Sequence, residues 1–212
     1  SYSVTVSVSD GSNTATQALT VNVTNVNEYS PVISGLASSV SVEENQTSVV
    51  TVSATDGDTS ETLSYSLTGT DASSLVINSS GVITFVNAAP DYETKTSYSV
   101  TVTVSDGANT DSQAVTVNVT NVNDISAVIS SSASFSAAEN QTAVGTVSAT
   151  DADGDSLTYS LSGTDASSFS INSSSGVITF GSAPDYETKT SYSVTVSVSD
   201  GSNTATQALT IN

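Results

Sequence analysis

Three carboxylates stand within five positions in the stretch ATDADGD (149–155): Asp151, Asp153 and Asp155. Two unit charges about 4 Å apart repel by roughly 1 kcal/mol in water and by about 4 kcal/mol near a protein surface. Among its 212 residues the chain has 21 acidic side chains, two lysines (Lys95 and Lys189), and neither arginine nor histidine. Basic side chains therefore cannot balance the acidic ones. A hard divalent cation can, because Ca²⁺ takes about six to eight oxygen ligands.

Most of the other acidic residues stand in short motifs that recur along the chain. These are an EN pair, a D-x-D segment, a DYE triplet, an SDG turn, and the segments NVNE (25–28) and NVND (121–124). Acidic residues at i and i+2 of an extended segment project to the same side, so we expect several carboxylates to converge. The candidate metal ligands are Glu44, Asp56, Asp58, Asp91, Glu93 and Asp106, then Glu139, Asp151, Asp153, Asp185, Glu187 and Asp200, with Asn27, Glu28, Asn123 and Asp124.

A long internal repeat carries these motifs. SYSVTVSVSDGSNTATQALT occupies 1–20 and, letter for letter, 191–210, and a close variant occupies 97–116. The repeat is therefore roughly 95 residues long, the size of a complete small domain rather than of a solenoid unit. We predict that 1–28 is the last part of one copy with its linker, 29–124 a complete copy, and 125–212 a nearly complete one.

Each copy has the pattern of a β-sandwich. Apolar residues alternate with Ser and Thr in SYSVTVTVS (97–105) and QAVTVNVTNV (113–122), as in strands with one buried face. VVTVSAT, LSYSL, LVI and GVITF predict shorter strands between Gly, Asn, Asp and Ser clusters. About seven strands per copy predict an all-β chain of tandem Greek-key, immunoglobulin-like sandwiches. Aromatic residues at strand positions, such as Tyr65 and Tyr159, are assigned to the core, and Tyr92 and Tyr186 are expected to pack.

The composition excludes several functions. A formal net charge of −19 repels nucleic acid and anionic membranes, and no apolar run is long enough to span a bilayer. The lack of cysteine excludes disulfides and thiolate metal sites, and fits either a bacterial surface protein or stability from another source, such as metal. Without histidine as a base, we expect no enzyme. An EF-hand that begins at Asp151 would need Gly and Glu where Ser156 and Ser162 stand.

The ordered set of motifs resembles cadherin repeats, and specifically the cadherin-like repeats of large bacterial surface adhesins. The matching elements are the EN glutamate, the A-x-D-x-D segments at 54–58 and 149–153, the DYE triplets, the Asp-Gly pairs, and the linkers NVNEY (25–29) and NVNDI (121–125). In that family Ca²⁺ binds between consecutive domains, usually three ions per junction. The resemblance implies a complete junction made by Glu44, Asp91, Glu93, Asn123, Asp124, Asp151, Asp153 and Asp200.

The resemblance also assigns the remaining candidates. Asn27 and Glu28 would act with Asp56, Asp58 and Asp106, whereas Glu139, Asp185 and Glu187 would face a following linker. The family linker D-x-N-D-N is changed, since Asn25 and Asn121 replace its first Asp and Tyr29 and Ile125 its last Asn. Two or three ions per junction therefore stay open. Asp155 has no counterpart in the family and is interpreted as a surface turn residue.

The resemblance implies a calcium-stiffened extracellular spacer, stalk or fibre module of a bacterial cell-surface adhesin. Its partners would be adjacent repeats of the same polypeptide or fibre, and other cell-surface molecules. The alternative is a directly adhesive module, homophilic or carbohydrate-binding. Docking of a tryptophan is excluded because the chain has none. We expect 1–28 to form a separate two-stranded piece, either a window on a longer tandem array or a hairpin that completes a neighbour's sandwich.

Overall fold

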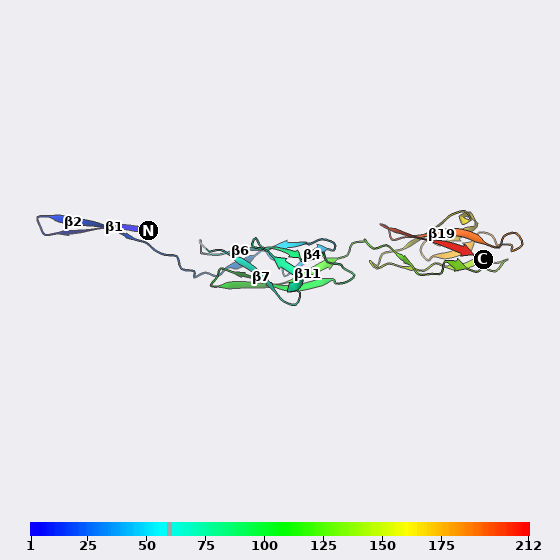
Figure 1. Ribbon diagram of the computed structural model, residues 1–212, viewed down its shortest axis with the longest axis horizontal. Helices are drawn as coiled ribbons and strands as arrows, with labels where there is room; N and C mark the ends of the chain where they lie inside the picture. The colour runs from blue at the N-terminus through cyan, green and yellow to red at the C-terminus, as the bar shows by residue number, and fades with distance from the viewer. Residues whose placement is uncertain (59–60) are drawn as a thin grey trace. The chain divides into compact units, whose positions relative to one another are not determined.

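The computed structural model describes residues 1–58 and 61–212 and is almost entirely β-structure (Figure 1). It divides into two compact units, the first formed by 1–90 and 97–119 and the second by 91–96 and 120–212. The strands of the first unit are β1 (Tyr2–Ser9), β2 (Thr14–Val21), β3 (Val32–Ser34), β4 (Ser39–Glu43), β5 (Ser48–Thr51), β6 (Ser53–Thr55), β7 (Ser64–Thr68), β8 (Leu75–Ile77), β9 (Val82–Phe85), β10 (Ser97–Ser105) and β11 (Thr110–Thr120).

The second unit repeats this order of elements. Its strands are β12 (Val128–Ile129), β13 (Ser134–Phe135), β14 (Ala143–Thr146), β15 (Ala149–Thr150), β16 (Thr158–Ser162), β17 (Phe169–Ile171), β18 (Val177–Phe180), β19 (Tyr192–Ser199) and β20 (Thr204–Ile211). Single 3₁₀ turns, η1 (Ala72–Ser74) and η2 (Ala166–Ser168), precede β8 and β17.

Both units contain the predicted immunoglobulin-like sandwich. In the first, one sheet has the order β4-β11-β10-β7, and the opposite layer is made by β5-β9-β8 and β3-β6. The second has the sheet β13-β20-β19-β16 and the opposite layer β14-β18-β17 with β12-β15. The roughly seven expected strands become nine segments in the described part of each sandwich, β3–β11 and β12–β20, because the first and second strands are both interrupted. The all-β, Greek-key prediction is therefore confirmed.

A glycine turn explains the interruption of the second strand. Between β5 and β6, the Val52 N–H donates to the Gly81 carbonyl at 2.8 Å. Gly81 has φ +79°, and a Cβ at this position would lie 2.2 Å from the Val52 carbonyl oxygen. Gly176 repeats this arrangement against Val147 in the second unit. A larger residue at either glycine would force the two chain segments apart.

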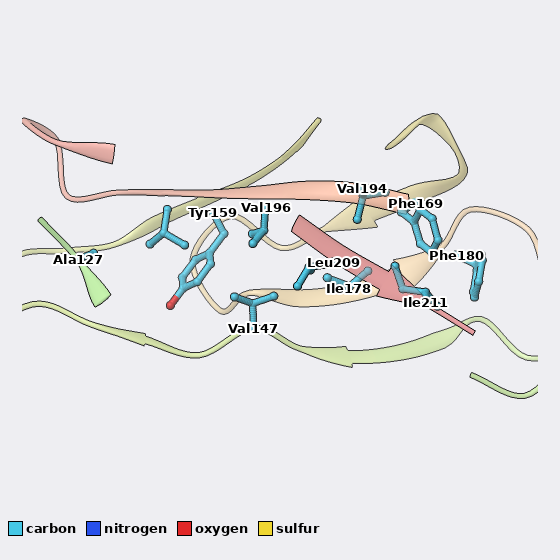
Figure 2. Packing of buried hydrophobic residues seen from close by; sticks show 11 residues of the cluster. Ala127, Val147, Tyr159, Phe169, Ile178, Phe180, Val194, Val196, Leu209 and Ile211 are labelled. Atoms are coloured by element: carbon cyan, nitrogen blue, oxygen red, sulfur yellow. The ribbon is translucent and has the colours of Figure 1, made fainter. Parts of the chain in front are cut away.

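The alternating valines of the long hairpins form the centre of each core. In the second unit Val194, Val196 and Val198 of β19 are buried against Ile178 of β18 and Leu209 of β20. Figure 2 shows these apolar side chains lying between the two layers, with the ring of Phe180 near one end and that of Tyr159 toward the other. Tyr65 packs against the core of the first unit, so its predicted assignment and that of Tyr159 are confirmed.

The hairpin β1–β2 is the expected two-stranded piece, and none of its residues is buried. Tyr2 pairs with Val21 and Val8 with Ala15, and among the described strands β1 and β2 pair only with each other. The side chains of Val4 and Val6 are each 49% exposed. This hairpin therefore presents a complete apolar strand face to solvent.

Candidate metal centre

The loop that follows β15 brings together the three carboxylates of ATDADGD. Asp151, Asp153 and Asp155 each offer an oxygen, and these three atoms lie within 4.8 Å of one another. The loop is a bend rather than an extended segment, and the Asp155 N–H donates to Asp151 Oδ1 at 3.3 Å. The expected convergence therefore occurs here, but the bend produces it rather than the i, i+2 alternation of a strand.

The linker that precedes β12 is anchored on this loop. The backbone N–H groups of Asp124 and Ile125 both donate to Asp153 Oδ2, at 3.1 and 2.9 Å. The side-chain amide of Asn121 donates to the Asp153 carbonyl at 2.9 Å. Asp153 thus positions the linker with one carboxylate oxygen and leaves the other, Oδ1, available.

Asp200 adds a fourth carboxylate from the turn between β19 and β20. Its Oδ1 accepts the N–H groups of Ser202 and Asn203 at 2.8 and 2.6 Å, and its carbonyl accepts the Asn123 amide at 3.2 Å. The N–H of Asn203 is the strongest influence that holds the pKa of Asp200 below its ordinary value. Asp200 is only 6% exposed, so a buried carboxylate is kept charged by the turn.

One oxygen of each of these four carboxylates is buried without a hydrogen bond. Within the described residues, these atoms are Oδ2 of Asp151, Oδ1 of Asp153, and Oδ2 of both Asp155 and Asp200, and Asp56 Oδ2 is in the same state in the first unit. Burial, followed by repulsion from the other three, raises the pKa of Asp155. Unpaired buried carboxylate oxygens are costly unless a cation or a donor satisfies them. The donor set is all oxygen, which fits Ca²⁺ and not a soft metal.

Two further predicted ligands, Glu93 and Asp124, lie beside this loop in the second unit. Glu93, Asp124 and Asp153 of the second unit each offer an oxygen within 4.8 Å of the other two. Glu44 belongs to the first unit and is 3% exposed, which is unusual for a glutamate.

The first unit has an equivalent arrangement around its own linker. The N–H groups of Glu28 and Tyr29 donate to Asp58 Oδ2 at 3.1 and 3.0 Å, as Asp124 and Ile125 do to Asp153. Asp106 accepts the Asn109 N–H at 2.6 Å, and the Asn109 side chain donates to the Tyr29 carbonyl at 3.1 Å. The Asp58 N–H donates to Asp56 Oδ1, so the predicted group 27–28 with Asp56, Asp58 and Asp106 comes together.

The DYE triplets are turns and not extended segments, which corrects the expectation from their spacing. The Lys95 and Lys189 N–H groups donate to the carbonyls of Asp91 and Asp185, at 2.9 and 3.0 Å. Both aspartates also accept a threonine hydroxyl at 2.8 Å, and this bond is the main cause of their lowered pKa values. Sequence spacing could not show that these carboxylates stabilise their own turns.

The acidic group at the DYE triplet of the second copy is exposed. Glu139, Asp185 and Glu187 each offer an oxygen within 4.8 Å of the others, and the Tyr186 N–H donates to Glu139 Oε2 at 3.2 Å. The Tyr186 side chain is 64% exposed, so the expectation that it packs is wrong. The turn points its ring to solvent, whereas strand alternation would have pointed it inward.

Asp155 also differs from its interpretation as a surface turn residue. Its side chain is half-buried, and its Oδ2 atom is buried. Sequence reasoning missed this residue because it is absent from the motif that identified its neighbours. The regular two-residue spacing of Asp151, Asp153 and Asp155 was the signal that could have identified it.

Comparison with known proteins shows one family. A model described as "Cadherin domain" matches residues 38–120 and 132–212. Human protocadherin Fat 4 is 34% identical over 215 residues, covering 92% of this chain and 4% of its own length. Human cadherin EGF LAG seven-pass G-type receptor 2 is 31% identical over 201 residues, covering 88% of this chain and 7% of its own length. The chain thus spans a small part of these relatives.

Solved structures agree with the sequence relatives. Mouse cadherin-23 EC22-24 has a TM-score of 0.73 at 26% identity, covering 99% of this chain and 73% of that one. The cis-dimer structure of protocadherin gammaB7 EC3-6 has a TM-score of 0.75 at 25% identity, covering 99% of this chain and 59% of that one. Within residues 1–58 and 61–212, no helix has the length and apolarity needed to cross a membrane.

Proposed function

Because this chain belongs to the cadherin domain family, we propose that it is a calcium-stiffened array of extracellular repeats. The observation that carries this proposal is the set of buried carboxylate oxygens without hydrogen-bond partners in the described residues, contributed by Asp151, Asp153 and Asp200. These groups stand beside Asp124 of the linker, whose N–H is bonded to Asp153. A cation that binds there would attach the linker to the sandwich.

We propose the ligand set implied by the family resemblance. The linker and the second copy supply Asn123, Asp124, Asp151, Asp153 and Asp200. These would act with three residues of the preceding sequence copy (29–124), namely Glu44, Asp91 and Glu93. The same assignment gives Asp56, Asp58 and Asp106 to the linker at 27–28, and Glu139, Asp185 and Glu187 to a following one. When bound, Ca²⁺ would neutralise the mutual repulsion of these carboxylates.

Calcium titration by calorimetry on the full chain tests this function, with small-angle scattering in chelator and in calcium as its mechanical readout. We expect saturable Ca²⁺ binding and a narrower distribution of maximum dimensions when the metal is present. Asp153→Asn should weaken binding, whereas Asp111→Asn, which lies outside the acidic motifs, should not. A calorimetric titration with no binding heat and unchanged scattering profiles would contradict the proposal.

We propose further that the array is a spacer in a bacterial cell-surface adhesin, with adjacent repeats as its partners. The repeated segments support a spacer, because long stretches of one copy recur in the next and 1–20 is identical to 191–210. The lack of cysteine supports the bacterial origin, although the relatives described above are animal proteins. Cadherin domains are adhesion modules, and we propose no enzymatic activity for this chain.

Direct adhesion is the second candidate. The exposed ring of Tyr186 favours it, because aromatic rings on a surface can stack on sugars or on a second copy. A glycan array and sedimentation of the full chain would separate the two forms of adhesion. Tyr186→Ser should abolish whichever interaction is found, and Tyr159→Phe, a buried position, should leave it unchanged.

A further inference from the structure

We infer that Asp155 is an additional calcium ligand of the centre in the second unit. The inference deepens the calcium-binding function proposed above and rests on it. Asp155 has no place in the motif set of the repeat.

Geometry places Asp155 with its neighbours. One of its carboxylate oxygens lies within 4.8 Å of oxygens from Asp151 and Asp153. Its own N–H donates to Asp151 Oδ1 at 3.3 Å, which fixes the backbone of the loop in the curved form. The carboxylate is therefore held at the cluster by the main chain.

The surroundings of the Asp155 carboxylate favour a bound cation. Asp155 Oδ2 is buried, and within the described residues it has no hydrogen-bond partner. A residue that served only as a surface turn would direct this atom to water or to a backbone N–H. Asp10 of the exposed hairpin does so, with its Oδ1 accepting two N–H groups at 2.8 and 2.6 Å.

Asp200 is a second, independent sign of a ligand at this place. Asp200 is only 6% exposed, and its Oδ2 atom likewise lacks a hydrogen-bond partner in the described part of the chain. Its charge acts on Asp155, together with those of Asp151 and Asp153. Three carboxylates with converging oxygens, and the charge of Asp200 near them, favour a cation at this place.

The first copy carries a carboxylate at the equivalent place. Its loop reads TDGDTSE (55–61) where the second copy reads TDADGDS (150–156). Counted back from the following strands, in which Tyr65 pairs with Val104 and Tyr159 with Val198, Glu61 stands where Asp155 does. Each loop therefore has three acidic residues.

Calorimetric titration of the full chain with Ca²⁺ tests the inference through Asp155→Asn, which keeps the side-chain shape and removes the charge. We expect the calcium site at this loop to weaken by about 10-fold or more, in the range found when a group that supports a metal is removed. Asp10→Asn is the matched control, since it removes the same charge from a turn outside the centre. Asp155→Glu should retain most of the affinity.

A second readout separates a ligand from a structural residue. In chelator, Asp155→Asn should melt at a higher temperature than the wild type, because it removes repulsion among buried carboxylates. In saturating Ca²⁺ the order should reverse.

If the wild type binds Ca²⁺ and Asp155→Asn binds equally well, Asp155 is not a ligand. If the wild type itself shows no binding, the proposed function fails and this inference with it. If Asp155→Asn does not fold, loss of affinity with Asp155→Ser but not with Asp155→Glu decides the question.

Discussion

The hairpins β1–β2 and β19–β20 share one sequence over 20 residues and differ in the burial of their apolar faces. Residues 1–20 and 191–210 are identical, and both hairpins pair their strands in the same register. Val6 is 49% exposed, whereas the equivalent Val196 is fully buried. Local sequence is therefore sufficient for the strands, the turn and the register. Burial is decided by whether a sandwich lies against the apolar face.

Amide exchange should give the largest difference between the two hairpins. A two-stranded hairpin alone is marginal in water, so amides of β1–β2 should exchange almost freely. Amides of β19–β20 should be protected up to the global unfolding free energy, about 5–15 kcal/mol for a domain. NMR is the suitable method, because peptides 1–20 and 191–210 have the same mass. Comparable protection in both hairpins would mean that the β1–β2 face is covered in solution.

Truncation of the same leucine in each hairpin should give the next largest effect. Leu209 is 1% exposed and Leu19 is 48% exposed. Leu209→Ala should lower the unfolding free energy of the second unit by about 2–5 kcal/mol, because it leaves a cavity in the core. Leu19→Ala should change the stability of the chain by no more than about 0.5 kcal/mol. Calorimetric melting of the two variants would show this, and equal losses would contradict the comparison.

The turn glycines test whether the same local strain has the same consequence. Gly11 and Gly201 have φ values of +94° and +104°, and a Cβ at either position would meet no atom within 4 Å. Alanine should therefore cost about 1–3 kcal/mol in each turn from backbone strain alone. Gly201→Ala should lower the melting temperature of the second unit, whereas Gly11→Ala should only loosen its hairpin, as chemical shifts would report. A fall in a unit's melting temperature with Gly11→Ala would show that β1–β2 is coupled to that unit.

The smallest expected effect is on the pH response of the two turns. The Asn13 N–H lowers the pKa of Asp10 from 3.8, as the Asn203 N–H lowers that of Asp200. Each ionised carboxylate therefore stabilises its turn above the unfolded-state value, and this contribution is lost as the pH falls through the lower folded-state value. NMR titration in chelator should show both groups titrating below pH 3.8. An ordinary value for Asp10 alone would mean that the exposed turn is not populated.

The candidate site was predictable where a motif is read directly from the sequence. The linkers at 25–29 and 121–125 bind to Asp58 and Asp153, as their pairing in the resemblance implies. Spacing alone failed at the DYE turns and at Tyr186, because an i, i+2 pattern does not distinguish a strand from a turn that is closed by an aspartate and a threonine. Those turns depend on hydrogen bonds that no pattern of residue types specifies.

Alternation of Val with Ser and Thr determined the strands, the hairpin register and the sandwich class, since period-two patterns act within a few residues. The tertiary structure decided what lies against each face. It buries Val196 and leaves Val6 exposed, and it brings Asp155 near enough to Asp200 for the two charges to repel each other. The physical reason is that burial and charge proximity depend on residues far apart in the chain, whereas backbone pairing in a hairpin depends on neighbours.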